Sequence, residues 1–132
     1  MENRILVLDD DPGILEVIDL SLTYCGFQVR PMLSGDNVFR MIDDFEPNLI
    51  ILDYLLRGKN GGEICQDLKN DPAKKDIPVI MLSAHLEAAS KKSEFGCDSF
   101  LAKPFDLDLL VNEIKMFINP DPIIFTTSQQ AN

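Results

Sequence analysis

The chain has 132 residues, 45% of them hydrophobic, which suits a single domain with a buried core. Its net charge of −10, from 12 basic and 22 acidic residues, argues against nucleic-acid binding because phosphate contacts need clustered lysine and arginine. No apolar stretch approaches the roughly 20 residues of a membrane-spanning helix, and the N-terminus leads into a strand pattern without a signal peptide. A cytoplasmic protein that contacts neither nucleic acid nor membrane is therefore expected.

The first predicted element is a strand at residues 5–8, a continuous apolar run that is typical of a strand covered on both faces. A helix follows, which Asp11 caps, Pro12 begins and Gly26 ends. The residues at helical spacing that should face the core are Ile14, Leu15, Ile18 and Leu22.

The segment 27–33 is predicted to be an edge strand because Pro31 cannot donate a hydrogen bond to a sheet ladder. A second helix is predicted next, capped by Ser34 and ended by Pro47. Its inward positions are Val38, Met41, Ile42 and Phe45. The apolar run 49–52 then repeats the pattern of a strand covered on both faces.

The second half of the chain continues the alternation. Its segments are, in order, a helix at 61–68, a strand at 79–82, a helix at 84–95 stopped by Gly96, and a strand at 100–102. A fifth helix begins after the cap Asp106 and ends before Pro120. Its inward positions are Leu109, Leu110, Ile114, Phe117 and Ile118.

This alternation predicts a three-layer α/β domain with right-handed crossovers between parallel strands. Five strands with the second at an edge fit the order 2-1-3-4-5 of the doubly wound, flavodoxin-like fold, here with five helices. The domain is expected to span residues 1–119. Residues 120–132 are expected to be a C-terminal tail with no output domain, in which the apolar segment 123–125 packs back or meets a partner.

Three cysteines, Cys25, Cys65 and Cys97, are far apart in the sequence and show no paired spacing. An odd number without a metal or disulfide pattern favours reduced, packed thiols over a redox or metal role.

Polar residues directly follow the predicted strands: Asp9 and Asp10 the first, Asp53 the third, Ser83 the fourth and Lys103 the last. In an open parallel sheet these ends meet at one crevice. Three neighbouring carboxylates repel one another, and magnesium, which prefers oxygen ligands and phosphate, removes that conflict. We therefore predict that Asp53 is a nucleophile that forms an aspartyl phosphate, with Lys103 supplying charge and Ser83 a hydroxyl donor.

In the order Asp9-Asp10, Asp53, Ser83 and Lys103-Pro104-Phe105, these residues resemble the response-regulator receiver domain of two-component signalling. The resemblance covers about residues 4–119. Among receiver domains, the chain resembles the single-domain type of the chemotaxis regulators. It implies that Asp53 takes a phosphoryl group from a histidine kinase or histidine phosphotransfer protein. It also implies a Mg2+ site formed by Asp10, Asp53 and the Leu55 backbone carbonyl, with Asp9 acting largely through water.

The resemblance further implies a cis peptide at Lys103-Pro104 and a phosphorylation switch. Ser83 would move toward the phosphoryl group and Phe100 would turn inward, although Phe100 reads equally well as a fixed core aromatic. The readout surface would comprise the fourth helix, the fifth strand and the fifth helix, and it would contact a downstream protein target or an output domain. A phosphorylation-dependent homodimer stays open, as does whether the domain stands alone or belongs to a larger regulator.

Two other functions share part of the pattern. A magnesium-dependent phosphatase of the haloacid-dehalogenase type also forms an aspartyl phosphate, but it usually has an acidic residue where this chain has Leu55. A flavodoxin-like electron carrier would have Ser, Thr and Gly after the first strand, where this chain has three acids. We therefore expect a signalling phosphoacceptor that assists only its own phosphorylation and dephosphorylation, not a turnover enzyme.

Overall fold

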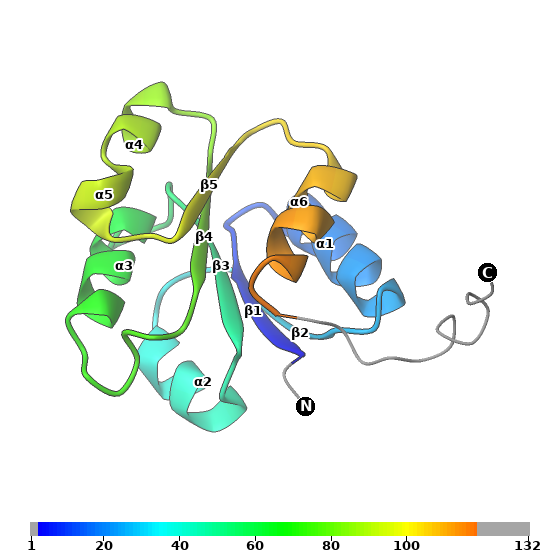
Figure 1. Ribbon diagram of the computed structural model, residues 1–132, viewed down its shortest axis with the longest axis horizontal. Coiled ribbons are helices and arrows are strands. Elements are labelled where there is room, and N and C mark those ends of the chain that lie inside the picture. Colours follow the sequence, from blue (N-terminus) through cyan, green and yellow to red (C-terminus); the bar gives the residue numbers. More distant parts are fainter. Residues whose placement is uncertain (1–2, 119–132) are drawn as a thin grey trace.

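The computed structural model describes residues 3–118, which form a five-stranded parallel sheet with helices on both faces (Figure 1). The strands are β1 (Arg4–Leu8), β2 (Gln28–Met32), β3 (Leu49–Asp53), β4 (Val79–Ser83) and β5 (Ser99–Ala102). Their order is β2-β1-β3-β4-β5, which confirms the predicted topology. The expected tail, residues 120–132 with its apolar segment 123–125, lies outside the described residues.

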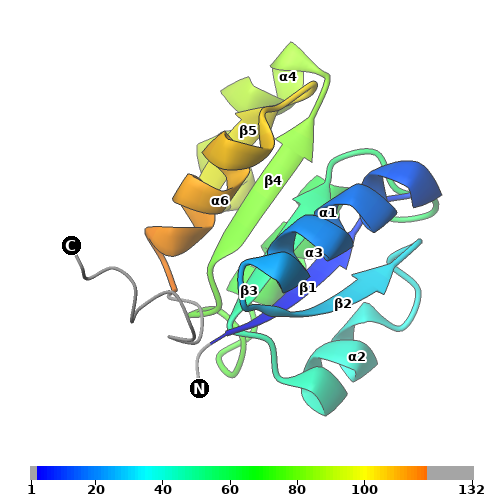
Figure 2. The ribbon, with the colours of Figure 1, turned by 90° about the vertical axis from the view of Figure 1, so that its right-hand side faces the viewer.

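Six helices lie within residues 3–118. They are α1 (Pro12–Tyr24), α2 (Val38–Phe45), α3 (Gly61–Lys69), α4 (Leu86–Ser90), α5 (Lys92–Phe95) and α6 (Leu107–Lys115). Helices α1 and α6 lie side by side on one face, and α2, α3 and α5 pack on the other, which gives the three predicted layers (Figure 2). Within residues 3–118, no helix has the length and apolar composition needed to cross a bilayer.

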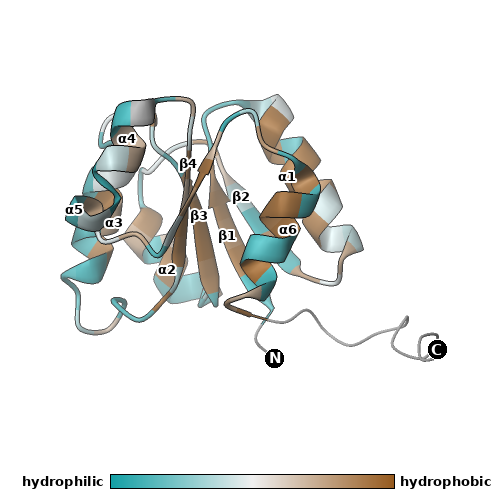
Figure 3. Ribbon diagram, turned by 45° about the horizontal axis from the view of Figure 1, so that its top comes forward, coloured by the Kyte–Doolittle hydropathy of each residue, from teal (hydrophilic) through white to brown (hydrophobic). Residues whose placement is uncertain are grey.

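The three central strands are buried on both faces, which explains their continuous apolar runs (Figure 3). Alternate side chains enter two separate cores because successive Cβ atoms of a strand point to opposite faces. The core beneath α2, α3 and α5 receives Leu6, Leu8, Ile50, Leu52, Val79 and Met81. The core beneath α1 and α6 receives Ile5, Val7, Leu49, Ile51, Ile80 and Leu82.

Strand β2 lies at the sheet edge, as its proline predicts. Pro31 is opposite Val7 of β1, and β2 pairs with no other strand. The missing N–H of Pro31 therefore leaves no gap in an interior ladder.

The predicted ends of α1 and the start of α6 are confirmed. The Asp11 carboxylate accepts the Gly13 N–H at 2.9 Å, and Pro12 stands at the first helical position. Gly26 follows the end of α1 with a φ of 99°, a conformation that glycine adopts without strain. At the other end of the chain, the Asp106 carboxylate accepts the Asp108 N–H at 2.8 Å.

The helix predicted over residues 84–95 forms as two successive short helices, which gives six helices where five were predicted and leaves the predicted fold unchanged. Residues 86–95 form two short helices, α4 and α5, which meet at Lys91. The Ser90 hydroxyl donates to the Glu87 carbonyl at 2.8 Å, and such side-chain bonds compete with the helical ladder. Gly96 ends α5 in the left-handed region, as predicted.

The predicted cap of α2 is also wrong. Ser34 stands four residues before the helix, and its hydroxyl oxygen accepts the Asp36 N–H at 3.3 Å in a turn. Asn37 takes the cap position with a φ of 61°. Of the inward positions, Val38 and Ile42 are buried, whereas Met41 and Phe45 are half-buried against the same core.

Two of the inward positions predicted for the last helix face solvent. Leu109 is 56% exposed and Phe117 37% exposed, whereas Leu110, Ile114 and Ile118 are buried. The buried residues follow the i, i+4, i+8 spacing of a single helical stripe, and Leu109 lies beside that stripe.

Candidate functional site

The polar residues that follow the strands lie together at the carboxyl ends of the strands, as predicted. The register places Leu8 opposite Leu52 and Asp53 opposite Leu82. Ser83 is opposite Ala102, the residue before Lys103. Parallel strands in this register bring their carboxyl ends to a common rim, where the site is formed.

Three carboxylates form the acidic part of the site. Asp9, Asp10 and Asp53 each present an oxygen atom, and these atoms lie within 4.8 Å of one another. Asp9 and Asp53 are buried, whereas Asp10 is exposed. Carboxylates this close repel unless a cation compensates their charge.

Lys103 brings the balancing charge from the loop after β5. Its Nζ lies 2.7 Å from Asp9 Oδ2 and 3.3 Å from Asp53 Oδ2. The backbone of the same residue is held by the sheet, because its N–H donates to the Ser83 carbonyl at 2.8 Å. The Lys103–Pro104 peptide bond is cis, as the family resemblance implied.

The lysine compensates the negative charge of Asp53 only in part. Burial, and next the charge of Asp9, raise the pKa of Asp53 from 3.8 to about 6. The charge and hydrogen bond of Lys103 and the N–H of Leu55 oppose this rise without cancelling it. For Lys103, burial alone would lower the pKa, but the hydrogen bond to Asp9 and the charges of both carboxylates raise it.

Asp9 is already engaged by the protein through both of its oxygens. Oδ2 accepts the Lys103 ammonium, and Oδ1 accepts the Asp11 N–H at 2.9 Å. Asp10 has neither contact and is exposed. Two adjacent aspartates therefore stand in different chemical situations.

Ser83 ends β4 at the same rim and is 2% exposed. Its Oγ accepts the His85 N–H at 2.9 Å, which leaves the hydroxyl proton available for a further acceptor. The small residue Ala84 is exposed beside it. His85, the only histidine of the chain, is exposed.

Phe100, the predicted switch residue, lies on β5 opposite Met81. It is half-buried and packs against the core beneath α3 and α5. The structure therefore places it on the strand that ends one residue before Lys103.

The loop after Asp53 contains two features that the sequence analysis missed. Asn60 and Glu63 form a reciprocal capping box that begins α3. Gly61 donates its N–H to the Tyr54 carbonyl at 2.8 Å, and a Cβ at Gly61 would overlap the Asp53 carbonyl oxygen. The Asn-Gly-Gly-Glu sequence carried the signal for both, because it combines a cap with residues that allow close backbone approach.

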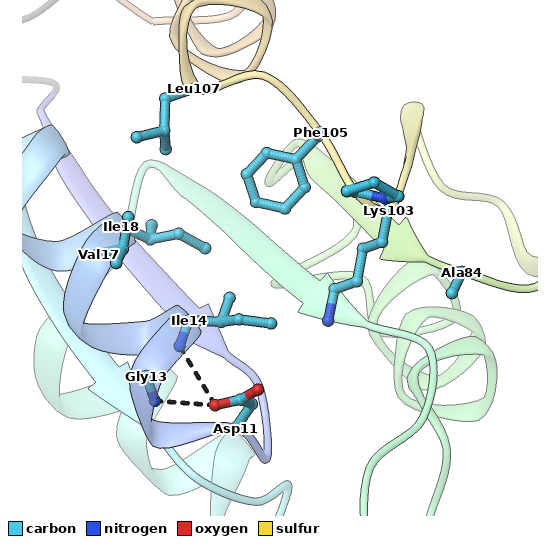
Figure 4. Close-up of a pocket in the computed structure, with 10 residues that line it drawn as sticks. Asp11, Gly13, Ile14, Val17, Ile18, Ala84, Lys103, Phe105 and Leu107 are labelled. Atoms are coloured by element: carbon cyan, nitrogen blue, oxygen red, sulfur yellow. Dashed lines mark hydrogen bonds between the residues drawn. The ribbon is translucent and has the colours of Figure 1, made fainter.

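A cavity of about 650 Å3 lies next to the acidic cluster, between α1 and the segment 103–107 (Figure 4). Lys103 reaches across its inner end toward the start of α1. Its apolar lining comprises Ile14, Val17, Ile18, Phe105 and Leu107. The phosphoacceptor candidate thus has a charged rim on one side and an apolar hollow beside it.

Comparison with known proteins links this chain to one protein family. The model of the response regulator receiver domain matches residues 5–115. The phosphate regulon transcriptional regulatory protein PhoB of Pseudomonas aeruginosa is 36% identical over 113 residues, which is 84% of this chain and 49% of that protein. The chain thus spans about half the length of the curated relatives that it matches.

Two solved structures have the same fold. The receiver domain of a signal transduction histidine kinase from Syntrophus aciditrophicus has a TM-score of 0.82 and 26% identity, covering 98% of this chain and 95% of that one. The response regulator TrrA from Thermotoga maritima, in complex with Mg(2+)-BeF, has a TM-score of 0.80 and 28% identity, covering 88% of this chain and 99% of that one. With the family match across residues 5–115, these findings show that the chain belongs to the response regulator receiver domain family.

Proposed function

We propose that Asp53 is the phosphoacceptor of a two-component or phosphorelay system. The observation that carries the proposal is the position of its carboxylate, within 4.8 Å of Asp9 and Asp10 and 3.3 Å from the Lys103 ammonium. A buried carboxylate with a pKa of about 6 remains ionised at neutral pH and is a competent nucleophile.

The three carboxylates fit a magnesium ion. Their oxygens are hard donors and lie close together, and burial and then the negative charge of Asp9 raise the pKa of Asp53. We assign direct ligation to Asp10, Asp53 and the Leu55 carbonyl, and a role through water to Asp9, since both Asp9 oxygens already accept protein hydrogen bonds. When bound, the ion supplies charge neutralisation for the phosphoryl oxygens.

In the proposed reaction an Asp53 oxygen attacks the phosphorus of a phosphohistidine. The phosphorus–nitrogen bond breaks, and the imidazole nitrogen leaves with the bonding electrons. Lys103, already 3.3 Å from Asp53, lies where it can donate to a phosphoryl oxygen. The Ser83 hydroxyl proton is a second donor, and catalysis rests on positioning and charge stabilisation.

The phosphoryl group would also act as the signal. It adds about −1.5 to −2 charges at the rim, enough to bias the Ser83 loop and the position of Phe100. The surface altered by this change would comprise α4, α5, β5 and α6, the counterparts of the predicted fourth helix, fifth strand and fifth helix. We propose that a histidine kinase or phosphotransfer protein donates the phosphoryl group, and that a downstream protein or an output domain reads the altered surface.

The enzymatic alternative lacks its proton donor in this geometry. Leu55 stands two residues after Asp53, where a haloacid-dehalogenase-type phosphatase would carry its general acid. We therefore propose a phosphoacceptor that turns over only its own phosphoryl group.

Labelling with acetyl phosphate or phosphoramidate, read by intact mass, tests the proposal. We expect one added phosphoryl group in the presence of magnesium and none on Asp53→Asn. Asp76→Asn is the matched control, since Asp76 is an exposed aspartate away from the rim, and it should be labelled like the wild type. Label retained by Asp53→Asn would move the acceptor to another residue.

A second experiment compares the proteins captured by the phosphorylated and the unmodified forms. A partner that prefers one form supports the switch. Identical partners for the two forms would leave a phosphate carrier without a switch.

A further inference from the structure

Two of the three cysteines meet in the fold although 32 residues separate them in the sequence. Cys65 lies in the middle of α3, and Cys97 follows the glycine that ends α5. Both are buried in the core beneath α2, α3 and α5, and each thiol is the largest influence on the pKa of the other. Cys25 belongs to the core on the opposite face of the sheet.

The contacts around the pair fix its register. One face of α3 packs along the segment 94–98, with Gly62 against the Phe95 ring and Lys69 paired to Asp98 at 2.8 Å. Between them, the Gln66 amide donates to the Glu94 carbonyl at 3.2 Å. Cys65 is three residues after Gly62 and four before Lys69, so it stands on the same helix face as both. The pairing of the two thiols is therefore held by contacts on either side.

The two thiols differ in a way that assigns their order of reaction. Cys97 is 6% exposed, whereas Cys65 is fully buried. The hydrogen bond from Cys65 lowers the pKa of Cys97, with a further contribution from the charge of Lys92. The same hydrogen bond and burial raise the pKa of Cys65. Cys97 is thus the more accessible sulfur, and this exposure assigns it the first step.

We propose that Cys65 and Cys97 form a reversible disulfide site that responds to hydrogen peroxide. The Cys97 thiolate attacks one peroxide oxygen, the oxygen–oxygen bond breaks, and the hydroxide released takes a proton to become water. The resulting sulfenic acid is attacked by the Cys65 sulfur, which loses its proton, and a second water leaves. The two sulfurs together give up two electrons, and the peroxide is reduced to two waters.

The disulfide would tie α3 to the segment that leads into the predicted readout surface. Phe95, two residues before Cys97, stacks on Tyr54 with ring centroids 5.7 Å apart, and Tyr54 directly follows Asp53. On its other side Cys97 is two residues before β5, which carries Phe100. Oxidation would therefore fix the turn between α5 and β5 without occupying the acidic rim.

Peptide mapping of the folded full chain tests the site directly. Digestion with trypsin leaves each cysteine in a different peptide. The peptides are residues 5–40 with Cys25, 60–69 with Cys65 and 93–115 with Cys97. After brief peroxide treatment and trapping of free thiols with N-ethylmaleimide, we expect peptides 60–69 and 93–115 to be joined and Cys25 to be alkylated. Dithiothreitol should release the link, and Cys25→Ser should form it as the wild type does.

Peptide mapping of the wild-type protein tests the proposal without a variant of the buried Cys65, which could fail to fold. A link that involves Cys25, or peroxide oxygens retained on Cys97 while Cys65 is alkylated, would overturn the proposal. As a second measurement, amide hydrogen exchange over residues 92–99 should slow several-fold in the oxidised protein, and unchanged exchange would refute the tethering.

This inference goes beyond the phosphoacceptor function and does not depend on it. Acetyl phosphate labelling of the same oxidised and reduced preparations separates the two. Labelling of Asp53 without a disulfide would refute only the redox site, whereas a disulfide without labelling would refute only the phosphoacceptor.

Discussion

Asp53→Asn should stabilise the protein in the absence of magnesium, although it removes the proposed nucleophile. The folded-state pKa of Asp53 is about 6, against 3.8 for the ordinary side chain. The folded protein therefore binds this proton more tightly than the unfolded chain, and its stability falls as pH rises from 3.8 through about 6. A difference of about 2 pKa units corresponds to about 3 kcal/mol at most, so we expect a gain of about 1 to 3 kcal/mol at pH 7.5.

Urea unfolding in EDTA measures this gain. The difference in unfolding free energy between Asp53→Asn and wild type should be about half as large at pH 5 as at pH 7.5. At pH 5 the folded wild type protonates Asp53 and so avoids part of the cost of burying its charge. Adding magnesium should stabilise the wild type and leave Asp53→Asn almost unchanged. Asp76→Asn, which alters an exposed aspartate, should change stability little at either pH.

Two results would refute this reasoning. If Asp53→Asn were less stable than the wild type at pH 7.5 in EDTA, the carboxylate would be a net stabilising group in the fold. If the difference were the same at pH 5 and 7.5, burial and the charge of Asp9 would not be acting on its titration.

Three further predictions concern the same rim. Lys103→Met should raise the pKa of Asp53 above 6, since the lysine lowers it, and slow acetyl phosphate labelling; a carboxyl 13C titration that shows no rise would contradict this. Gly61→Ala should destabilise the protein by about 1 to 3 kcal/mol in urea, because its Cβ would overlap the Asp53 carbonyl, whereas Gly13→Ala, whose Cβ meets only a side-chain oxygen at 3.3 Å, should have little effect. EDTA should reduce labelling of the wild type to background and magnesium should restore it; labelling that survives EDTA would contradict the metal site.

The convergence of the site could be predicted because it depends on strand ends alone. Once Asp53 and Ser83 are assigned to the ends of buried parallel strands, the topology places them at the same rim without any knowledge of loop structure. The edge position of β2 could also be predicted, since Pro31 excludes an interior strand. These predictions use periodicity and backbone chemistry, which are local properties.

The errors arose where several local interactions compete. Ser34 satisfies the usual residue preference for a helix cap, but a turn forms there and Asn37 takes the cap position. Leu109 and Leu110 are adjacent and equally apolar, so sequence alone does not say which of them faces the sheet. In the region of α4 and α5, the Ser90 side chain adds an alternative hydrogen bond that a periodic pattern does not reveal.

The neighbouring residues Asp9 and Asp10 show how the structure gives a physical reason for a difference that the family resemblance only implied. The resemblance implies that Asp10 ligates magnesium directly and that Asp9 acts through water, and in the structure the first carboxylate is buried and the second is exposed. Lys103, 94 residues further along the chain, and the Asp11 N–H then occupy both oxygens of Asp9. Asp10 has neither contact, which favours the proposed direct ligation of a cation by Asp10, and this difference depends on the contact between Asp9 after β1 and Lys103 after β5.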